Sequence, residues 1–421
     1  MTSPETKTPF VAIACGGTGG HLFPGLAVAA ELQNRGCKIA LLISPKEIDQ
    51  QAVKFALERR PPARREPADN SNNAGLEAGV PMEVFTLPAV GLQNRNYFSF
   101  AGSFVKSLFA ARKIFNKRRP DAVLAMGGFT SAPPIWVGKD LGAKSFLHES
   151  NTIPGRANRI LSRFVNGAFI GFPEAAARLK TRKVTITGTP VRLQFQPRDA
   201  AACQTALGLE PDRPTILVVG GSQGASGLNE MILSALPLLV NHASRITHYV
   251  QFLHLTGAND FEKVKTVYAA RGIKAVVKPF LAEMELALGA ATVAVSRAGA
   301  SSLAEIAAMR LPSLLVPFPT AADNHQFSNA RAFEKTGAAK LLEQKNSTQE
   351  EVAAILTELV EDKSARSKMQ SALAQWHAPR AAEQIAEIML AAIARQPEVT
   401  TAKKSGCGCG CAHGGAKHAT S

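Results

Sequence analysis

The chain has 421 residues, and Lys and Arg outnumber Asp and Glu so that its formal net charge is +15 at pH 7. This length exceeds the size at which single hydrophobic cores usually stop growing, so we expect two domains. No apolar stretch reaches the roughly 18 residues of a spanning helix, which excludes an integral membrane protein. Residues 1–9 do not resemble a secretory signal, so we expect the protein in the cytoplasm. The positive charge favours acidic partners.

The first unit of the chain combines a strand, a glycine-rich turn and a helix. Residues 10–14 form an apolar run typical of a buried parallel strand, and 26–32 follow a helical pattern. Pro24 suits the first turn of that helix, and Gly36 marks its end.

The glycine-rich turn between them predicts an anion site. Unpaired backbone N–H groups at a helix start, together with the helix dipole, bind anions and most often phosphate. His21 stands at the mouth of this site. The loop matches neither the dinucleotide fingerprint nor the P-loop, and a plain tight turn in an α/β core is the alternative interpretation.

A second strand is predicted at 39–44 and a helix at 45–57. Residues 58–79 lose all periodicity and read as a solvated insertion, and strand character resumes at 84–87. The segment 97–119 then combines phenylalanines with lysines and arginines at helical spacing. Such a basic amphipathic helix can pack its phenylalanines into a core or place them in a membrane surface, and the pattern leaves both open.

Polar residues gather where the next strands end. The strand 121–125 runs into Met126-Gly127-Gly128, a second glycine turn, and the strand 144–147 runs into His148-Glu149-Ser150-Asn151. In an open parallel sheet, ligands bind at this edge.

The pattern starts over in the second half of the chain. After a strand at 184–187, residues 188–192 read as a hinge, and a strand at 215–219, a glycine turn at 220–227 and a helix from 228 repeat the first unit. Further strands are predicted at 247–253, 275–277, 292–296 and 313–316. The alternation predicts two doubly wound α/β domains.

The last helices are predicted at 349–376 and 380–395. The tail beyond them is glycine-rich and low in complexity. Its Cys407, Cys409 and Cys411 could bind a soft metal, but they lack the usual paired spacing, and we expect no link to catalysis.

One strand, turn and helix of the second half carries a distinctive carboxylate. Residues 293–305 read Val-Ala-Val-Ser-Arg-Ala-Gly-Ala-Ser-Ser-Leu-Ala-Glu, which places Glu305 in the early turns of the helix. A carboxylate there can accept hydrogen bonds from both hydroxyls of a ribose, while the helix start faces a diphosphate. An exposed glutamate favoured by the helix dipole is the simpler alternative.

Taken together, the motifs resemble the MurG family of bacterial peripheral membrane transferases. The resemblance rests on Gly-Gly-Thr-Gly-Gly-His-x-x-Pro at 16–24, Met-Gly-Gly at 126–128, His-Glu-x-Asn at 148–151, Gly-x-Pro-Val-Arg at 188–192, Gly-Gly-Ser-Gln-Gly-Ala at 220–225, Ser-Arg-x-Gly-Ala at 296–300, and Val-Pro-Phe with Asp-x-x-Gln-x-x-Asn at 316–329. It covers about residues 9–395 in order.

The resemblance implies an architecture and an activity. The fold would be GT-B, two Rossmann-like doubly wound domains facing a cleft, with an acceptor and membrane-binding domain at 1–190, a UDP-sugar domain at 191–376, a returning helix at 377–396 and a disordered tail at 397–421. The activity would be inverting transfer of N-acetylglucosamine from UDP-N-acetylglucosamine to the C4 hydroxyl of undecaprenyl-pyrophosphoryl-N-acetylmuramoyl pentapeptide, converting lipid I to lipid II in peptidoglycan synthesis.

The resemblance also implies the site residues. The donor would contact Thr18, Gly19, Gly20, Asn151, Arg192, Ser222, Leu281, Ala300, Ser301, Ser302, Leu303, Ala304, Glu305 and Gln326. The acceptor pyrophosphate would meet the glycine turns at Gly16, Gly17, Gly127 and Gly128. Ser150, Thr189 and His325 depart from the family pattern.

The chemistry requires a base for the acceptor hydroxyl and a group that stabilises the leaving diphosphate. His21 is the preferred base, because a helix N-terminus disfavours imidazolium, and Glu149 is the second candidate. No Asp-x-Asp occurs in the chain, so we expect no metal or other cofactor, and helix N-termini with Arg192 are the substitutes.

The expected partners are the donor, lipid I, the anionic inner-leaflet surface and cell-wall synthesis proteins, at the cytoplasmic face of the inner membrane. An enzyme of another glycolipid is the nearest alternative, and a nucleotide-sugar or nucleic-acid binding protein without catalysis is the other. With three tyrosines and two tryptophans the chain offers few stacking residues, so we expect no nucleic acid.

Overall fold

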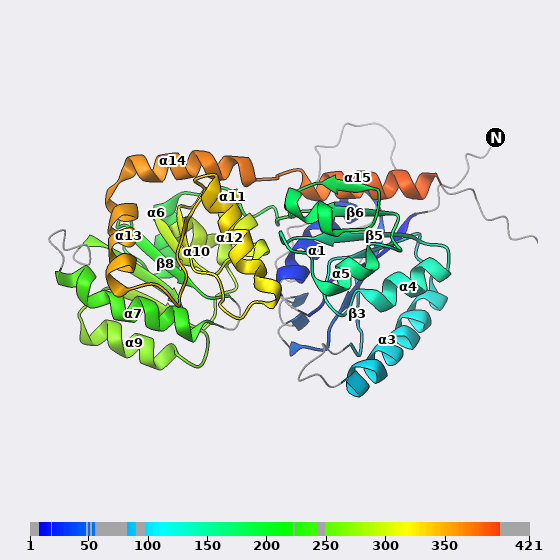
Figure 1. Ribbon diagram of the computed structural model, residues 1–421, viewed down its shortest axis with the longest axis horizontal. Helices are drawn as coiled ribbons and strands as arrows, with labels where there is room; N and C mark the ends of the chain where they lie inside the picture. The colour runs from blue at the N-terminus through cyan, green and yellow to red at the C-terminus, as the bar shows by residue number, and fades with distance from the viewer. Residues whose placement is uncertain are drawn as a thin grey trace, which may run out of the picture.

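The computed structural model describes residues 8–17, 19–47, 49–50, 53–54, 82–89, 97–221, 224–241 and 249–395. They form two parallel β-sheets, each covered by helices, in two lobes that lie side by side (Figure 1). The 58–79 insertion, the Cys-rich tail, Thr18 and Ser222 lie outside the described residues.

The N-terminal sheet has the strand order β3-β2-β1-β4-β5-β6-β7, with every neighbouring pair parallel. Its strands are β1 (Phe10–Ala14), β2 (Lys38–Ile43), β3 (Glu83–Thr86), β4 (Ala122–Ala125), β5 (Lys144–Glu149), β6 (Gly167–Ile170) and β7 (Val184–Ile186). Its helices are α1 (Gly19–Asn34), α3 (Tyr97–Lys117), α4 (Ala132–Asp140) and α5 (Arg156–Leu161), with a 3-10 turn η1 (Pro173–Arg178).

The C-terminal sheet has the order β10-β9-β8-β11-β12-β13 and is also parallel. Its strands are β8 (Thr215–Val219), β9 (Gln251–Leu255), β10 (Ala275–Lys278), β11 (Val293–Ser296), β12 (Ser313–Leu315) and β13 (Lys340–Leu341). Its helices are α6 (Ala200–Leu207), α7 (Ser226–Asn241), α9 (Phe261–Ala270), α10 (Met284–Ala290), α11 (Ala300–Met309), α12 (His325–Lys335), α13 (Gln349–Glu361) and α14 (Lys363–Leu373), with 3-10 turns η2 (Ala322–Asn324) and η3 (Ala374–Trp376). Helix α15 (Ala381–Ala394) follows η3 in the chain.

Strand β1 shows why these apolar runs fold as central strands. All five of its residues are buried, and alternate side chains enter two different cores. Val11 and Ile13 pack on the side of α1 and α15, whereas Phe10, Ala12 and Ala14 pack on the opposite side. A strand buried on both faces needs a continuous apolar sequence, and its N–H and C=O groups pair with the neighbouring strands.

The chain ends by returning to the first lobe. The indole of Trp376 stacks on Phe333, with ring centroids 4.4 Å apart, where the chain leaves the second lobe. Helix α15 then buries Ile385 and Met389 in the N-terminal core against α1. Figure 1 shows α14 over one lobe and α15 over the other.

Two helices differ from their sequence-based predictions. Helix α1 begins at Gly19, so Pro24 lies inside it, one turn later than predicted. Because proline has no N–H, the helix loses one backbone hydrogen bond there, to a carbonyl in its first turn. The helix predicted over 349–376 is broken at Asp362, whose carboxylate accepts from the N–H groups of Ser364 and Ala365 and caps α14. The short strands β6 and β13 gave no clear sequence signal.

No helix in the described part of the chain combines the length and apolar character needed to cross a membrane. Nor do the described residues bring three or more His, Cys, Asp or Glu side chains together as a set of metal ligands.

Candidate active site

The glycine turns lie where the strand order of each sheet reverses. In the N-terminal sheet they follow the neighbouring strands β1 and β4, and in the C-terminal sheet the corresponding turns follow β8 and β11. Ligands of doubly wound folds bind at such switch points. Helices α1 and α11, which begin at these turns, contact each other across the junction between the lobes.

The N–H groups of three predicted pyrophosphate glycines already have acceptors within the protein. Gly16 donates to Thr130 Oγ1 at 3.2 Å, Gly17 to Asp49 Oδ2 at 2.7 Å, and Gly127 to Ser131 Oγ at 3.1 Å. These glycines therefore shape the turns, and in this structure their N–H groups donate to side chains of the protein itself. The first turn of α1, with Gly19 and Gly20, is the better source of donors for a diphosphate.

Asp49 braces the first turn and was missed by the sequence reasoning, because an aspartate in an unremarkable helical segment gives no signal. It is buried, and its Oδ2 accepts from the hydroxyl of Ser44 at 2.5 Å as well as from Gly17. Lys46 donates to the Gly17 carbonyl at 2.8 Å and lies over the ring of Phe129, which follows the second glycine turn. The two turns are thus held together.

His21 packs directly against the second glycine turn. A Cβ atom at Gly127 would lie 2.8 Å from His21 Cε1, so only glycine leaves room for the imidazole. Its Nδ1 is buried and makes no hydrogen bond within the described residues. Burial lowers the pKa of His21, against Glu149 and the Met126 carbonyl, which raise it. The ring is therefore held in the neutral form, which can accept a proton.

The carboxylate of Glu149 is fully engaged in holding its own loop. Its Oε1 accepts from the backbone and side-chain N–H groups of Asn151 at 2.9 and 3.0 Å, and its Oε2 accepts from Gly155 N–H and Asn158 Nδ2 at 3.0 and 2.9 Å. A carboxylate that already accepts four hydrogen bonds has little capacity left for a substrate proton. The geometry favours His21 over Glu149 as the base.

His148 and Ser150 explain one departure from the family pattern. His148 donates from Nε2 to the Gly188 carbonyl at 3.0 Å, and the Ser150 hydroxyl lies 3.2 Å from its Nδ1. Burial lowers the pKa of His148 to about 4. The neutral imidazole of His148 thus contacts the Ser150 hydroxyl through one nitrogen and, through the other, joins the end of β5 to the hinge at Gly188.

Arg192 lies between the two lobes. Its guanidinium stacks on Phe23 of α1, 4.3 Å from the ring centroid, and its Nη2 lies 3.7 Å from Glu305 Oε1 of α11. Both charged side chains are nearly buried, at 11% and 12% exposed. Burial raises the pKa of Glu305 to about 7, although Arg192 lowers it. The predicted ribose and diphosphate partners are therefore brought together beside the first two turns of α11.

The segment 318–329 presses against the N-terminal lobe. Asp323 pairs with Arg159 at 2.6 Å, and His325 lies near enough to His21 to lower the pKa of its imidazole. Asn329, quoted in the sequence motif without a role, hydrogen-bonds both lobes. Its three-residue spacing from Gln326 was the available signal, since such residues share a helix face.

The remaining predicted donor residues fall at the ends of strands and helices in the second lobe. Residues 300–304 form the first turns of α11, which follow its N-cap Gly299. Leu281 is buried after β10, and Gln326 Oε1 accepts from the N–H groups of Ala298 and Phe318 at 3.2 and 3.0 Å. Gln326 thus joins the turn before α11 to the loop after β12.

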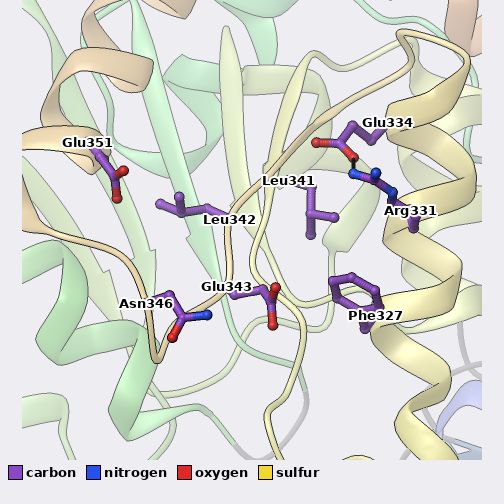
Figure 2. Close-up of a pocket in the computed structure, with 8 residues that line it drawn as sticks. All are labelled: Phe327, Arg331, Glu334, Leu341, Leu342, Glu343, Asn346 and Glu351. Atoms are coloured by element: carbon purple, nitrogen blue, oxygen red, sulfur yellow. Dashed lines mark hydrogen bonds and ion pairs between the residues drawn. The ribbon is translucent and has the colours of Figure 1, made fainter.

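A separate surface pocket lies on another face of α12 (Figure 2). Phe327, Arg331 and Glu334 line it from the helix. The opposite side is lined by Leu341, Leu342, Glu343, Asn346 and Glu351. No predicted site residue lines this pocket. Helix α12 therefore presents one face to the junction and a different face to this pocket.

Comparisons with known proteins agree with this geometry. Residues 11–170 match the glycosyltransferase family 28 N-terminal domain, and 215–385 match the C-terminal domain of the same family. Two parallel-sheet lobes with family 28 domains have the GT-B architecture, so the fold and the site define a glycosyltransferase that uses a UDP sugar.

Named relatives narrow the class. The UDP-N-acetylglucosamine–N-acetylmuramyl-(pentapeptide) pyrophosphoryl-undecaprenol N-acetylglucosamine transferase of Anaeromyxobacter sp. is 35% identical over 387 residues, 91% of this chain and 93% of its own. The enzyme of the same name from Citrifermentans bemidjiense is 35% identical over 88% of this chain and 96% of its own. The crystal structure of Acinetobacter baumannii MurG matches with a TM-score of 0.66 and 25% identity, covering 91% of this chain and 99% of that one. The chain belongs to the MurG family.

Proposed function

We propose that this protein transfers N-acetylglucosamine from UDP-N-acetylglucosamine to the C4 hydroxyl of undecaprenyl-pyrophosphoryl-N-acetylmuramoyl pentapeptide, with inversion, in peptidoglycan synthesis. The observation that carries the proposal is the meeting of α1 and α11, which sets a neutral His21 on one side of the junction and the Arg192–Glu305 pair on the other. The relatives that carry this activity in their names match over about nine-tenths of the chain, which supports the same substrates here.

The donor binds to the second lobe in this proposal. Glu305 accepts from the ribose hydroxyls, and the N-terminus of α11 and Arg192 face the diphosphate. Leu281 lies beside the uracil, and Gln326 and Asn151 contact the sugar. Binding of the diphosphate would draw Arg192 away from Glu305 and leave the carboxylate to the ribose.

The reaction is a single displacement. The C4 oxygen of the acceptor bonds to the anomeric carbon as the bond from that carbon to the UDP oxygen breaks, and the hydroxyl proton passes to His21. The negative charge that develops on UDP is stabilised by Arg192 and the first turn of α11, which are aligned before the reaction begins. Glu149 positions the loop beside His21 and does not itself take the proton.

The acceptor reaches the site from the membrane side of the first lobe. Its pyrophosphate lies at the first turn of α1, and its lipid chain runs toward α3. On α3, Phe115 is buried in the core, whereas Phe98 is 94% exposed and Phe109 is 73% exposed. We assign these exposed rings, with Trp136 of the adjacent α4, to peripheral contact with the anionic inner leaflet.

The test is transfer itself. Labelled UDP-N-acetylglucosamine is incubated with a lipid I analogue, and the lipid-linked product is identified by mass spectrometry, with its linkage assigned by NMR. A β-1,4-linked disaccharide on the lipid supports the proposal, and product that still forms in EDTA supports a reaction without a metal. UDP release without the lipid product, or transfer to a different acceptor class in preference to lipid I, would contradict it.

A further inference from the structure

Asn329 makes a complete set of side-chain hydrogen bonds across the junction between the lobes. It lies in the second turn of α12 and is fully buried, at 0% exposed. Its Oδ1 accepts from the N–H and the hydroxyl of Thr152 at 2.9 and 3.0 Å. Its Nδ2 donates to Asn151 Oδ1 at 3.0 Å and to the Ala298 carbonyl at 3.1 Å. A single amide therefore joins the first lobe to the turn that precedes the donor helix.

The direction of this hydrogen-bond chain is fixed at both ends. The carboxylate of Glu149 can only accept, so Asn151 presents its NH₂ group to Glu149 and its oxygen to Asn329. The carbonyl of Ala298 also can only accept. Asn329 must therefore present NH₂ to both Asn151 and Ala298. A carboxylate at position 329 would face two acceptors, and rotating the Asn151 amide would only move the conflict to Glu149.

The chain connects the two halves of the reaction. On the donor side, Ala298 immediately precedes Gly299, the N-cap of α11. On the acceptor side, Glu149 holds Asn158, and both Asn158 and His21 flank Gly127, where an added Cβ would lie 3.4 Å from Asn158 Nδ2 and 2.8 Å from His21. The position of α11 is thereby linked to the loop that packs around the base.

We propose that Asn329 is a positioning residue that sets the base loop of the first lobe against the start of the donor helix through Asn151 and Glu149. The inference rests on the proposed function. Because all of its bonds are polar, water can replace them when the lobes separate, so the contact can open and close at little net cost. Asn329 thus fixes the distance over which the sugar moves, and it leaves the donor site itself intact when its bonds are lost.

The experiment compares Asn329→Asp with two other variants in the lipid I assay and in calorimetry with UDP. Thr152→Val keeps the backbone N–H and removes only the hydroxyl contact from the acceptor side. Asn346→Asp makes the same chemical change at an exposed position of the same lobe, beside the pocket in Figure 2, and is the matched control. Thermal unfolding is recorded for each variant.

Asn329→Asp should lower kcat by about 100-fold, the effect of a misplacement of about 1 Å between reacting groups, while the Kd for UDP stays within about threefold. Thr152→Val should lower kcat in the same direction by several-fold, and Asn346→Asp should change neither quantity. The inference is overturned if Asn329→Asp and Thr152→Val keep kcat within about twofold, or if UDP affinity falls in step with kcat. Absence of transfer by the unaltered protein would instead refute the proposed function, and this inference with it.

Discussion

Replacing Glu305 by Gln should make the ligand-free protein more stable. Burial raises the pKa of this carboxyl to about 7, so at neutral pH the fold holds a charge in a place that disfavours it. Against an ordinary pKa of about 4.5, the shift corresponds to at most about 3 kcal/mol at pH 7.5. Gln keeps the shape of the side chain without the charge. It recovers only part of this free energy, because the ion pair between Arg192 and Glu305 is lost.

The sign of the pH dependence follows from the raised pKa. A group with a raised folded-state pKa stabilises the fold fully below its unfolded pKa, and that contribution is lost as pH rises through about 7. The gain from Glu305→Gln should therefore be largest near pH 8, fall to at most about 1.4 kcal/mol near pH 5.5, and vanish below about pH 4.5.

The same substitution should weaken UDP binding. Hydrogen bonds to a charged group contribute about 1.5 to 3 kcal/mol, so Kd should rise by roughly 10- to 150-fold. Stability and function thus oppose each other at this residue, as is common where an active site holds a buried charge.

Two measurements test this reasoning. Calorimetry with UDP gives the affinity, and thermal unfolding at pH 5.5 and pH 8 gives the stability, where each kcal/mol moves the Tm of a domain of this size by about 2 to 4 °C. Glu343→Gln, at an exposed position of the same lobe, is the control. An unchanged UDP affinity would remove Glu305 from the ribose site, and a stabilisation that does not shrink on acidification would refute the burial argument.

Three further outcomes follow from the structure. His21→Ala should lower kcat by about 10²- to 10⁴-fold and abolish the acidic limb of the pH–rate profile, while the affinity for UDP barely changes. A near-full kcat with weaker acceptor binding would mean that His21 only shapes the glycine turn. Phe98→Ser with Phe109→Ser should weaken sedimentation with anionic vesicles, most visibly at low salt, whereas Ile186→Ser, which changes an apolar side chain on β7 that is 59% exposed, should not. Equal loss in both would point to misfolding. Because burial lowers the pKa of His148 to about 4, its contribution to stability is complete above pH 6.5 and should fall by about 2 kcal/mol between pH 7 and 5. In denaturant titrations His148→Gln, which can keep the hydrogen bond to the Gly188 carbonyl, should lose about 2 kcal/mol less over this pH range than the unaltered protein. An equal loss of stability in both proteins would contradict the assignment.

Local sequence determined the elements and the order in which they repeat. Strand β1 is buried on both faces because its residues are apolar without alternation. Gly36 follows the end of α1 with a φ of +81°, a conformation that favours a residue without a Cβ atom. These signals act within a few residues, so they can be read from the chain. The sequence motifs also placed Glu305 in the early turns of a helix, which is α11 in the structure.

Tertiary structure alone decided which of those groups are available for chemistry. The glycine N–H groups at 16, 17 and 127 looked free in the sequence, but Thr130, Asp49 and Ser131 accept from them. Glu149 looked like a base until its four donors were seen, and the phenylalanines of α3 divided between core and surface only when the lobe was packed. Asn329 shows the limit most clearly: its partners in the first lobe, Thr152 and Asn151, lie 177 and 178 positions away, and no local pattern specifies a hydrogen bond that forms only where two lobes meet.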